Sequence, residues 1–248
     1  MTTDPRRITM TVTYDGSAFF GFQIQPGVPT IQAELERALA RILGHQVRVH
    51  GSGRTDTGVH ALGQVILVQT DRPIPVDKLI VALNGALPPS IRIRRIEEAA
   101  PGFHPRFSAR AKHYRYLFRE VAERSPFLER HFCQVEGSLD LAAMEQGAAR
   151  FVGEHDFSAF TRSPAGKENP VRTILDSRLA REGAVITFDV VGTGFLHNMV
   201  RNMAKALLLI GLHKMEPHEI PELYRNQDRR RLGSPAPAAG LYLMRVMY

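Results

Sequence analysis

The stretch from Gly51 to Ala61 contains the residues best suited to chemistry. It reads GSGRTDTGVHA, with three glycines around an arginine and an aspartate. Arg54 and Asp56 are two positions apart, so in an extended backbone their side chains project to the same side, where the cation would keep the carboxylate ionised. The glycines would let another chain approach closely. We interpret this stretch as an active-site loop, although an ordinary turn, with Asp56 bonded to its own backbone, is also compatible with these residues.

The elements around this loop follow a β-α-β-β-α-β order in the first half of the chain. Apolar residues alternate with threonines from Ile8 to Tyr14, which predicts a half-buried strand. An apolar stripe between Thr30 and Gly44 predicts a helix with those two residues as its caps. The expected elements are strands at 8–14, 47–50, 63–70 and 91–96, and helices at 31–42 and 76–87.

The second half repeats this order without any repeat of residues. The expected elements are strands at 111–120, 171–181, 184–191 and 240–247, and helices at 139–151 and from Phe195 or Leu196 to Leu212. A polar loop at 161–169 is expected to be mobile. The chain therefore predicts an α+β fold of two ferredoxin-like units, 1–104 and 105–248, with antiparallel sheets and a catalytic cleft between the units.

The charge of the chain indicates a polyanionic partner. The 248 residues carry a formal net charge of +7, and 27 of the 32 basic residues are arginines. Arginine favours bidentate contacts with phosphate and stacks on bases, although a genome rich in G and C would also enrich it. The basic residues are spread over both halves, which suits a protein that binds a polyanion across a broad surface.

Other sequence features argue against disulfides, metal sites and membrane insertion. Cys133 is the single cysteine, so no internal disulfide can form, and no paired metal-ligand motif occurs among the ten histidines. The N-terminus lacks the apolar core of a signal peptide, and no apolar run approaches the length of a membrane span. We therefore expect a cytoplasmic protein without a structural metal.

Two further segments place polar or aromatic side chains on one face at regular spacing. On the helix expected up to Leu212, His197, Arg201 and Lys205 fall at i, i+4 and i+8, which suits either a solvated face or a basic edge beside a cleft. In the strand at 111–120, Tyr114 shares a face with Tyr116 and Phe118.

Several motifs together resemble those of the TruA family of tRNA pseudouridine synthases. The stretch from Gly53 to His60, GRTDTGVH, resembles the family motif GRTDAGVH, and the other similar stretches occur in family-like order along nearly the whole chain. They are YDG at 14–16, GFQ at 21–23, FHPRFSA at 103–109, YRY at 114–116, FLHNMVRN at 195–202 and GLYL at 240–243. Thr57 stands where the family usually has Ala, and Phe22 where Trp is common.

The resemblance implies a tRNA pseudouridine synthase that works without cofactor or metal. Such an enzyme would isomerise uridine to pseudouridine at positions 38, 39 and 40 of the anticodon stem-loop of tRNA, as a homodimer. The uracil must leave C1′, rotate and return through C5, which needs a carboxylate, a dry pocket and a base for the C5 proton. A target base inside a stem must also be taken out of its stack.

The resemblance also assigns roles to five residues. Asp56 would be the catalytic carboxylate, either adding to C1′ or removing a sugar proton to give a glycal. Tyr114 would stack on the uracil and take the C5 proton, and Arg201 would pair with Asp56. Arg54 would stabilise the flipped nucleotide, and Leu243 would line the uracil pocket.

Two other classes of function remain compatible with parts of the sequence. A non-catalytic RNA-binding protein with two RRM-like sheets would have the same order of elements, but neither half contains an RNP1-like aromatic motif. A metal-dependent nuclease would need a carboxylate cluster, and the sequence shows no such cluster.

Overall fold

The computed structural model describes residues 6–161 and 169–248 of the chain. These residues form two compact units, and the chain crosses from one unit to the other twice. The first unit contains the residues up to Arg110 together with Leu243–Tyr248, and the second contains Ala111–Tyr242. The first crossing follows Arg110, six residues after the expected boundary at residue 104. The return of Leu243–Tyr248 to the first unit was not expected, because it depends on contacts between residues that are far apart in sequence. The expected loop at 161–169 lies almost wholly outside the described residues.

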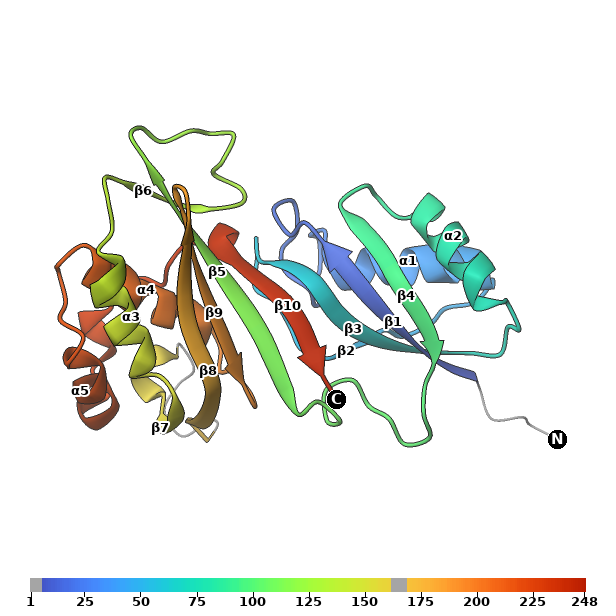
Figure 1. The fold of residues 1–248 in the computed structure, drawn as a ribbon. Helices are drawn as coiled ribbons and strands as arrows, with labels where there is room; N and C mark the ends of the chain where they lie inside the picture. Colours follow the sequence, from blue (N-terminus) through green and yellow to red (C-terminus); the bar gives the residue numbers. More distant parts are fainter. Residues whose placement is uncertain (1–5, 162–168) are drawn as a thin grey trace. The chain divides into compact units, whose positions relative to one another are not determined.

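The first unit has the predicted β-α-β-β-α-β order. Its strands are antiparallel, with the spatial order β4-β1-β3 and β2 paired to β3, which is the strand order of a ferredoxin-like sheet. Helices α1 and α2 contact each other and cover one face of the sheet (Figure 1). The elements are β1 (Arg6–Tyr14), α1 (Ile31–Leu43), β2 (His50–Gly51), β3 (His60–Thr70), α2 (Val76–Ala86) and β4 (Ile91–Glu98).

The local signals at α1 act as predicted. The Thr30 hydroxyl accepts a hydrogen bond from the Ala33 N–H, and Gly44 ends the helix in the left-handed region with φ 78°. The strand expected at 47–50 is shorter and shifted in the structure, since β2 is formed by His50 and Gly51, which pair with Leu67 and Ile66. Pairing across the sheet therefore decides where β2 lies.

The second unit is built on an antiparallel sheet of β5, β9, β8 and β7 in that order. Helices α3 and α4 pack against each other over this sheet (Figure 1). The elements are β5 (Ala111–Val121), β6 (Cys133–Glu136), α3 (Leu141–Ala149), β7 (Gly153–Asp156), β8 (Val171–Glu182), β9 (Val185–Gly192), α4 (Met199–Gly211) and α5 (Glu219–Asn226). Short 3-10 helices lie at Ser158–Phe160, Arg229–Arg231 and Ala238–Gly240, and β10 (Leu241–Met247) carries the chain back to the first unit.

Three details of the second unit correct the predictions. The sheet is not wholly antiparallel, because β6 pairs with β5 in parallel, with Phe118 opposite Cys133. Helix α3 is shorter than expected because Asp140 caps it, accepting a hydrogen bond from the Ala143 N–H at 2.9 Å. Helix α4 begins at Met199 because Asn198 has a left-handed backbone, with φ 60°. None of the described helices is long and apolar enough to cross a membrane.

Candidate active site

Asp56 lies in the loop between β2 and β3, half-buried, and the residue before it is fixed to two other segments. Thr55 is buried, and its hydroxyl hydrogen-bonds the Tyr14 hydroxyl at 2.8 Å. Its carbonyl accepts the N–H of Phe22 at 3.0 Å. Asp56 is therefore held in place by β1 and by the segment that precedes α1, which is the kind of support that a catalytic side chain needs.

A tight turn follows Asp56. The Val59 N–H donates to the Asp56 carbonyl at 3.1 Å, and Gly58, the third residue of the turn, has φ 77°, as a type II turn requires. Thr57 is the second residue of this turn and is exposed. The side chain that departs from the usual Ala therefore belongs to an exposed residue of the turn.

Two glycines of the preceding segment allow the loop to pack so closely. A Cβ on Gly21, which has φ 85°, would lie 2.7 Å from the Thr55 carbonyl oxygen, and a Cβ on Gly16 would collide with the Val59 backbone. The Phe22 ring packs on Gly51, where a Cβ would lie 2.7 Å from it. The close approach that the glycines were expected to permit thus involves the 16–22 segment of the same unit.

The entrance of the loop is fixed by a buried polar network. The Ser52 hydroxyl donates to the Gln64 side-chain oxygen at 2.5 Å, and the Gln64 amide donates to the Gly53 carbonyl at 3.0 Å. Ser52 and Gln64 are both fully buried. At the exit, the buried His60 ring accepts the Gly16 N–H through Nδ1 at 3.2 Å. The loop is therefore preorganised at both ends.

Arg54 differs from Asp56 in its environment. Its side chain is exposed, and within residues 6–161 and 169–248 the guanidinium forms no ion pair or hydrogen bond with the protein. The ion pair with Asp56 that the spacing of the two residues would allow is therefore not formed among the described residues. An exposed, unpaired guanidinium is well suited to contact phosphate.

Leu243 also belongs to the first unit, on β10. It is 1% exposed, and the following backbone runs beside β3, since a Cβ on Gly63 would lie 2.5 Å from the Met244 carbonyl oxygen. The three predicted residues of the first unit are thus Arg54, Asp56 and Leu243.

Tyr114 lies on β5 in the second unit. It pairs with Val190 on β9, is 9% exposed, and its ring meets the Phe195 ring edge-on with centroids 5.1 Å apart. Tyr116, two residues further along the same face, is buried and donates its hydroxyl to the Pro237 carbonyl at 2.8 Å. The two tyrosines therefore have different environments: Tyr116 is fully buried and belongs to the hydrophobic core, whereas Tyr114 is 9% exposed.

Arg201 lies in the first turn of α4. Its Nε donates to the Ala236 carbonyl and its Nη1 to the Asn198 side-chain oxygen, both at 2.8 Å, so the plane of the guanidinium is fixed. The N-terminal end of a helix carries partial positive charge, so a cation there costs stability and the first turn favours an anion nearby. His197 lies before the first residue of α4. Of the three polar residues expected on this helix, only Arg201 and Lys205 therefore lie on it.

Sequence reasoning missed a charged cluster on β5 and β9. The buried Asp189 carboxylate accepts two hydrogen bonds from Arg115, both at 3.0 Å, and contacts His113 Nε2 at 2.5 Å. Burial alone would raise the pKa of Asp189, but the hydrogen bonds from Arg115 and His113 outweigh it and lower the pKa. His113 and Arg115 flank Tyr114, and only the strand register, with Arg115 opposite Asp189, reveals the cluster.

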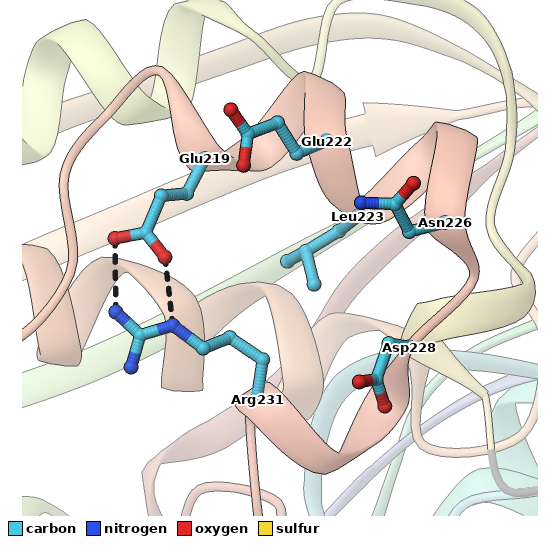
Figure 2. Close-up of a pocket in the computed structure, with 6 residues that line it drawn as sticks. All are labelled: Glu219, Glu222, Leu223, Asn226, Asp228 and Arg231. Atoms are coloured by element: carbon cyan, nitrogen blue, oxygen red, sulfur yellow. Dashed lines mark hydrogen bonds and ion pairs between the residues drawn. The ribbon is translucent and has the colours of Figure 1, made fainter.

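A pocket in the second unit does not suit a polyanion. It has a volume of about 180 Å³ and lies between α5 and the segment that follows it (Figure 2). Glu219 pairs with Arg231 at 2.7 and 2.9 Å, and this pairing lowers the pKa of Glu219. Glu222 and Asp228 add two further carboxylates, so the lining is net negative and would repel phosphate.

Comparisons with known proteins identify the family. The sequence profile described as tRNA pseudouridine synthase matches residues 10–108 and 148–248, which include Arg54, Asp56, Arg201 and Leu243 but not Tyr114. Proteins named tRNA pseudouridine synthase A from Exiguobacterium sp. and from Geobacillus kaustophilus are 42% and 44% identical to the chain. The alignments cover 98% of this chain in both cases, and 98% and 95% of the two relatives.

A solved Cbf5-Nop10-Gar1 complex also matches, at a TM-score of 0.36 and 13% identity, over 92% of this chain and 61% of that one. At that similarity the match adds nothing to the assignment. The sequence profile and the full-length relatives agree with the motif around Asp56, and the chain belongs to the tRNA pseudouridine synthase A (TruA) family.

Proposed function

We propose that this protein isomerises uridine to pseudouridine at positions 38, 39 and 40 in the anticodon stem-loop of tRNA. The observation that carries the proposal is the family match across the chain, which includes the preorganised loop with Asp56. In the reaction the N1–C1′ bond breaks, the uracil turns, a C5–C1′ bond forms, and the proton lost from C5 is balanced by a proton gained at N1. No atom enters or leaves, so no co-reactant is required.

Asp56 is the proposed catalytic carboxylate. The turn that follows it and the two contacts of Thr55 hold its backbone, so its side chain reaches the sugar without reorganisation of the loop. It acts either as a nucleophile at C1′ or as a base that removes a sugar proton to give a glycal. Both roles use the same ionised oxygen, so both are compatible with the support described.

Arg201 and Tyr114 are the proposed partners of Asp56 on the basis of the motif resemblance. Arg201 has a fixed guanidinium plane at a helix end that favours an anion, which fits a residue that orients a carboxylate. Tyr114 would stack on the uracil and accept the C5 proton. In the same assignment the exposed Arg54 supports the flipped nucleotide, and the buried Leu243 lines the uracil pocket.

The proposal extends to the state and the place in which the enzyme works. On the basis of the motif resemblance, we propose that the protein is a homodimer and acts in the cytoplasm. The names of the relatives support tRNA as its substrate. The net charge of +7 supplies the general attraction for the phosphate backbone.

The decisive experiment maps pseudouridine in tRNA incubated with the purified protein in the presence of a chelator. The wild-type protein is expected to form pseudouridine at positions 38, 39 and 40. Asp56→Ala should form none while it still binds tRNA, and the exposed neighbour Thr57→Ala should retain full activity. Product formation by Asp56→Ala at the wild-type rate would contradict the assignment of the carboxylate.

The same experiment addresses the other two functions. A non-catalytic RNA-binding protein is not favoured by the family match, and it would bind tRNA without forming pseudouridine. A metal-dependent nuclease would cleave tRNA and stop when the chelator is added. Pseudouridine formed in intact tRNA with the chelator present separates the proposed isomerase from both.

A further inference from the structure

The segment that leaves β4, residues 99–110, is tied down over the first unit. The Phe103 carbonyl accepts a hydrogen bond from Arg7 at 2.6 Å, and the Phe103 ring meets the Tyr248 ring edge-on at 4.8 Å. The Tyr248 hydroxyl donates to the Pro105 carbonyl at 2.9 Å. The Arg110 N–H donates to the Met247 carbonyl at 2.8 Å. The segment is therefore a fixed part of the unit.

His104 organises the tip of this segment. Its Nδ1 lies 3.1 Å from the Arg106 N–H and 3.3 Å from the Phe107 N–H, and it accepts from both. An acceptor nitrogen carries no proton, so the ring is neutral. Burial, and after it the charges of His50, Arg106 and Arg7, lower the pKa of His104 in agreement with this state. The two backbone N–H groups therefore fix the orientation of the His104 ring.

Phe107 rests on this histidine and faces solvent. The two ring centroids are 4.4 Å apart with an angle of 33° between the planes, yet Phe107 is 78% exposed. The Arg106 guanidinium lies 5.8 Å from the Phe107 ring centroid. A ligand that covers this ring would remove apolar surface from water, and because the ring is already fixed in place little conformational freedom would be lost on binding.

The charge around Phe107 favours an anionic ligand. From residue 99 to residue 119 the sequence contains no Asp or Glu, and Arg106 and Arg110 on either side of Phe107 are both exposed. A second copy of the chain that met this patch by twofold symmetry would bring like charges together. An aromatic ring between cations is the pattern by which proteins stack an unpaired base and hold its phosphates.

We propose that Phe107, supported by His104 and flanked by Arg106, is a stacking platform for an unpaired nucleobase of the bound RNA. The inference rests on the proposed tRNA substrate and adds a binding residue outside the loop of Asp56. Phe107 touches the RNA and takes no part in the chemistry. Its contribution is therefore to affinity, with KM as the kinetic quantity that it changes.

The test measures binding of an unmodified tRNA transcript to Phe107→Ala, Phe107→Leu and Phe107→Trp. Loss of one base stack is expected to weaken binding by about 5- to 150-fold in the Ala and Leu variants, whereas Trp keeps the affinity. Phe127→Ala is the matched control, because Phe127 is 89% exposed and contacts no other ring among the described residues. Kinetics should show a raised KM for Phe107→Ala and an unchanged kcat at saturating tRNA.

Salt dependence separates stacking from charge. Arg106→Ala should lower the slope of log K against log salt by about 0.7 to 0.9, whereas Phe107→Ala should leave the slope unchanged. A blunt RNA duplex, which offers no unpaired base, should bind wild type and Phe107→Ala equally.

Three results would overturn the inference. Phe107→Leu could bind tRNA as tightly as Phe107→Trp, or Phe107→Ala and Phe127→Ala could lose the same affinity. The third is a change in oligomeric state, measured as the molecular mass in solution, that accounts for the weaker binding of Phe107→Ala. Pseudouridine formation by the wild-type protein is measured in the same samples, so that the two proposals can fail separately. If the wild-type protein forms no pseudouridine, the proposed function is refuted, and not the stacking role of Phe107.

Discussion

The hydroxyl pair of Tyr14 and Thr55 offers a quantitative test of how the Asp56 loop is supported. Both side chains are buried, at 2% and 7% exposure, and their oxygens are 2.8 Å apart. Burial raises the pKa of Tyr14, and its hydroxyl therefore stays protonated as a hydrogen-bonding group. Removing one partner leaves the other buried without this bond, which costs about 1 to 3 kcal/mol. Replacing both by apolar groups of the same shape removes the imbalance.

We therefore expect a double-mutant cycle with Tyr14→Phe and Thr55→Val to show coupling. Each single variant should lose about 1 to 3 kcal/mol, and the double variant should lose no more than the worse single. The coupling energy is then at least as large as the smaller single loss, about 1 to 3 kcal/mol. For a chain of this size 1 kcal/mol corresponds to about 2 to 4 °C in Tm, which thermal unfolding can measure. The kcat should fall in each single variant, because the residue before Asp56 loses a restraint.

Thr57→Ala is the control for this cycle. Thr57 lies in the same loop but is exposed, so its replacement should change stability by less than about 0.5 kcal/mol. Losses that simply add in the double variant would refute the coupling. A Thr57→Ala variant as impaired as Thr55→Val would refute the view that the buried side of the loop positions Asp56.

Two further predictions concern a glycine and a buried carboxylate. Gly21→Ala should cost about 2 to 4 kcal/mol and lower kcat, because the new Cβ meets the Thr55 carbonyl, whereas Gly27→Ala, with φ 75° and open space, should cost only about 1 kcal/mol; equal Tm shifts would contradict this. Asp189→Asn should cost about 1.5 to 3 kcal/mol at neutral pH, because the hydrogen bonds from Arg115 and His113 lose the charge of their acceptor. Since the folded pKa of Asp189 is lowered, its contribution is present above the ordinary value of 3.8 and lost as the pH falls through the folded pKa. Acid unfolding should therefore be steeper for wild type than for Asp189→Asn, and parallel curves would show that the carboxylate adds no stability.

Features that depend only on residues close to one another in the sequence could be predicted from it. The caps of α1 and the end of α2 before Pro88 follow from local backbone preferences, and both were confirmed. The order of elements in the first unit follows from hydrophobic periodicity. The motif around Asp56 identified the family because its residues are contiguous.

Features that depend on pairing between distant segments could not be predicted. Strand β6 has four residues and no alternation, and only its alignment with Phe118 on β5 makes it a strand. The support of Asp56 comes from Tyr14 and Gly21, which lie far from it in sequence. The start of α4 depends on the left-handed backbone of Asn198, a residue type that also occurs inside helices.

The return of Leu243–Tyr248 to the first unit has a consequence for synthesis of the protein. The ribosome makes this unit first, yet Met247 accepts a hydrogen bond from Arg110, and Tyr248 packs on Phe103. Residues 111–242 separate the two parts of this unit, and at about 5 to 20 residues per second their synthesis takes roughly 7 to 26 s. The unit that carries Asp56 is therefore completed only after the second unit has been synthesised, so a chain that terminates within the second unit lacks the residues that finish the first.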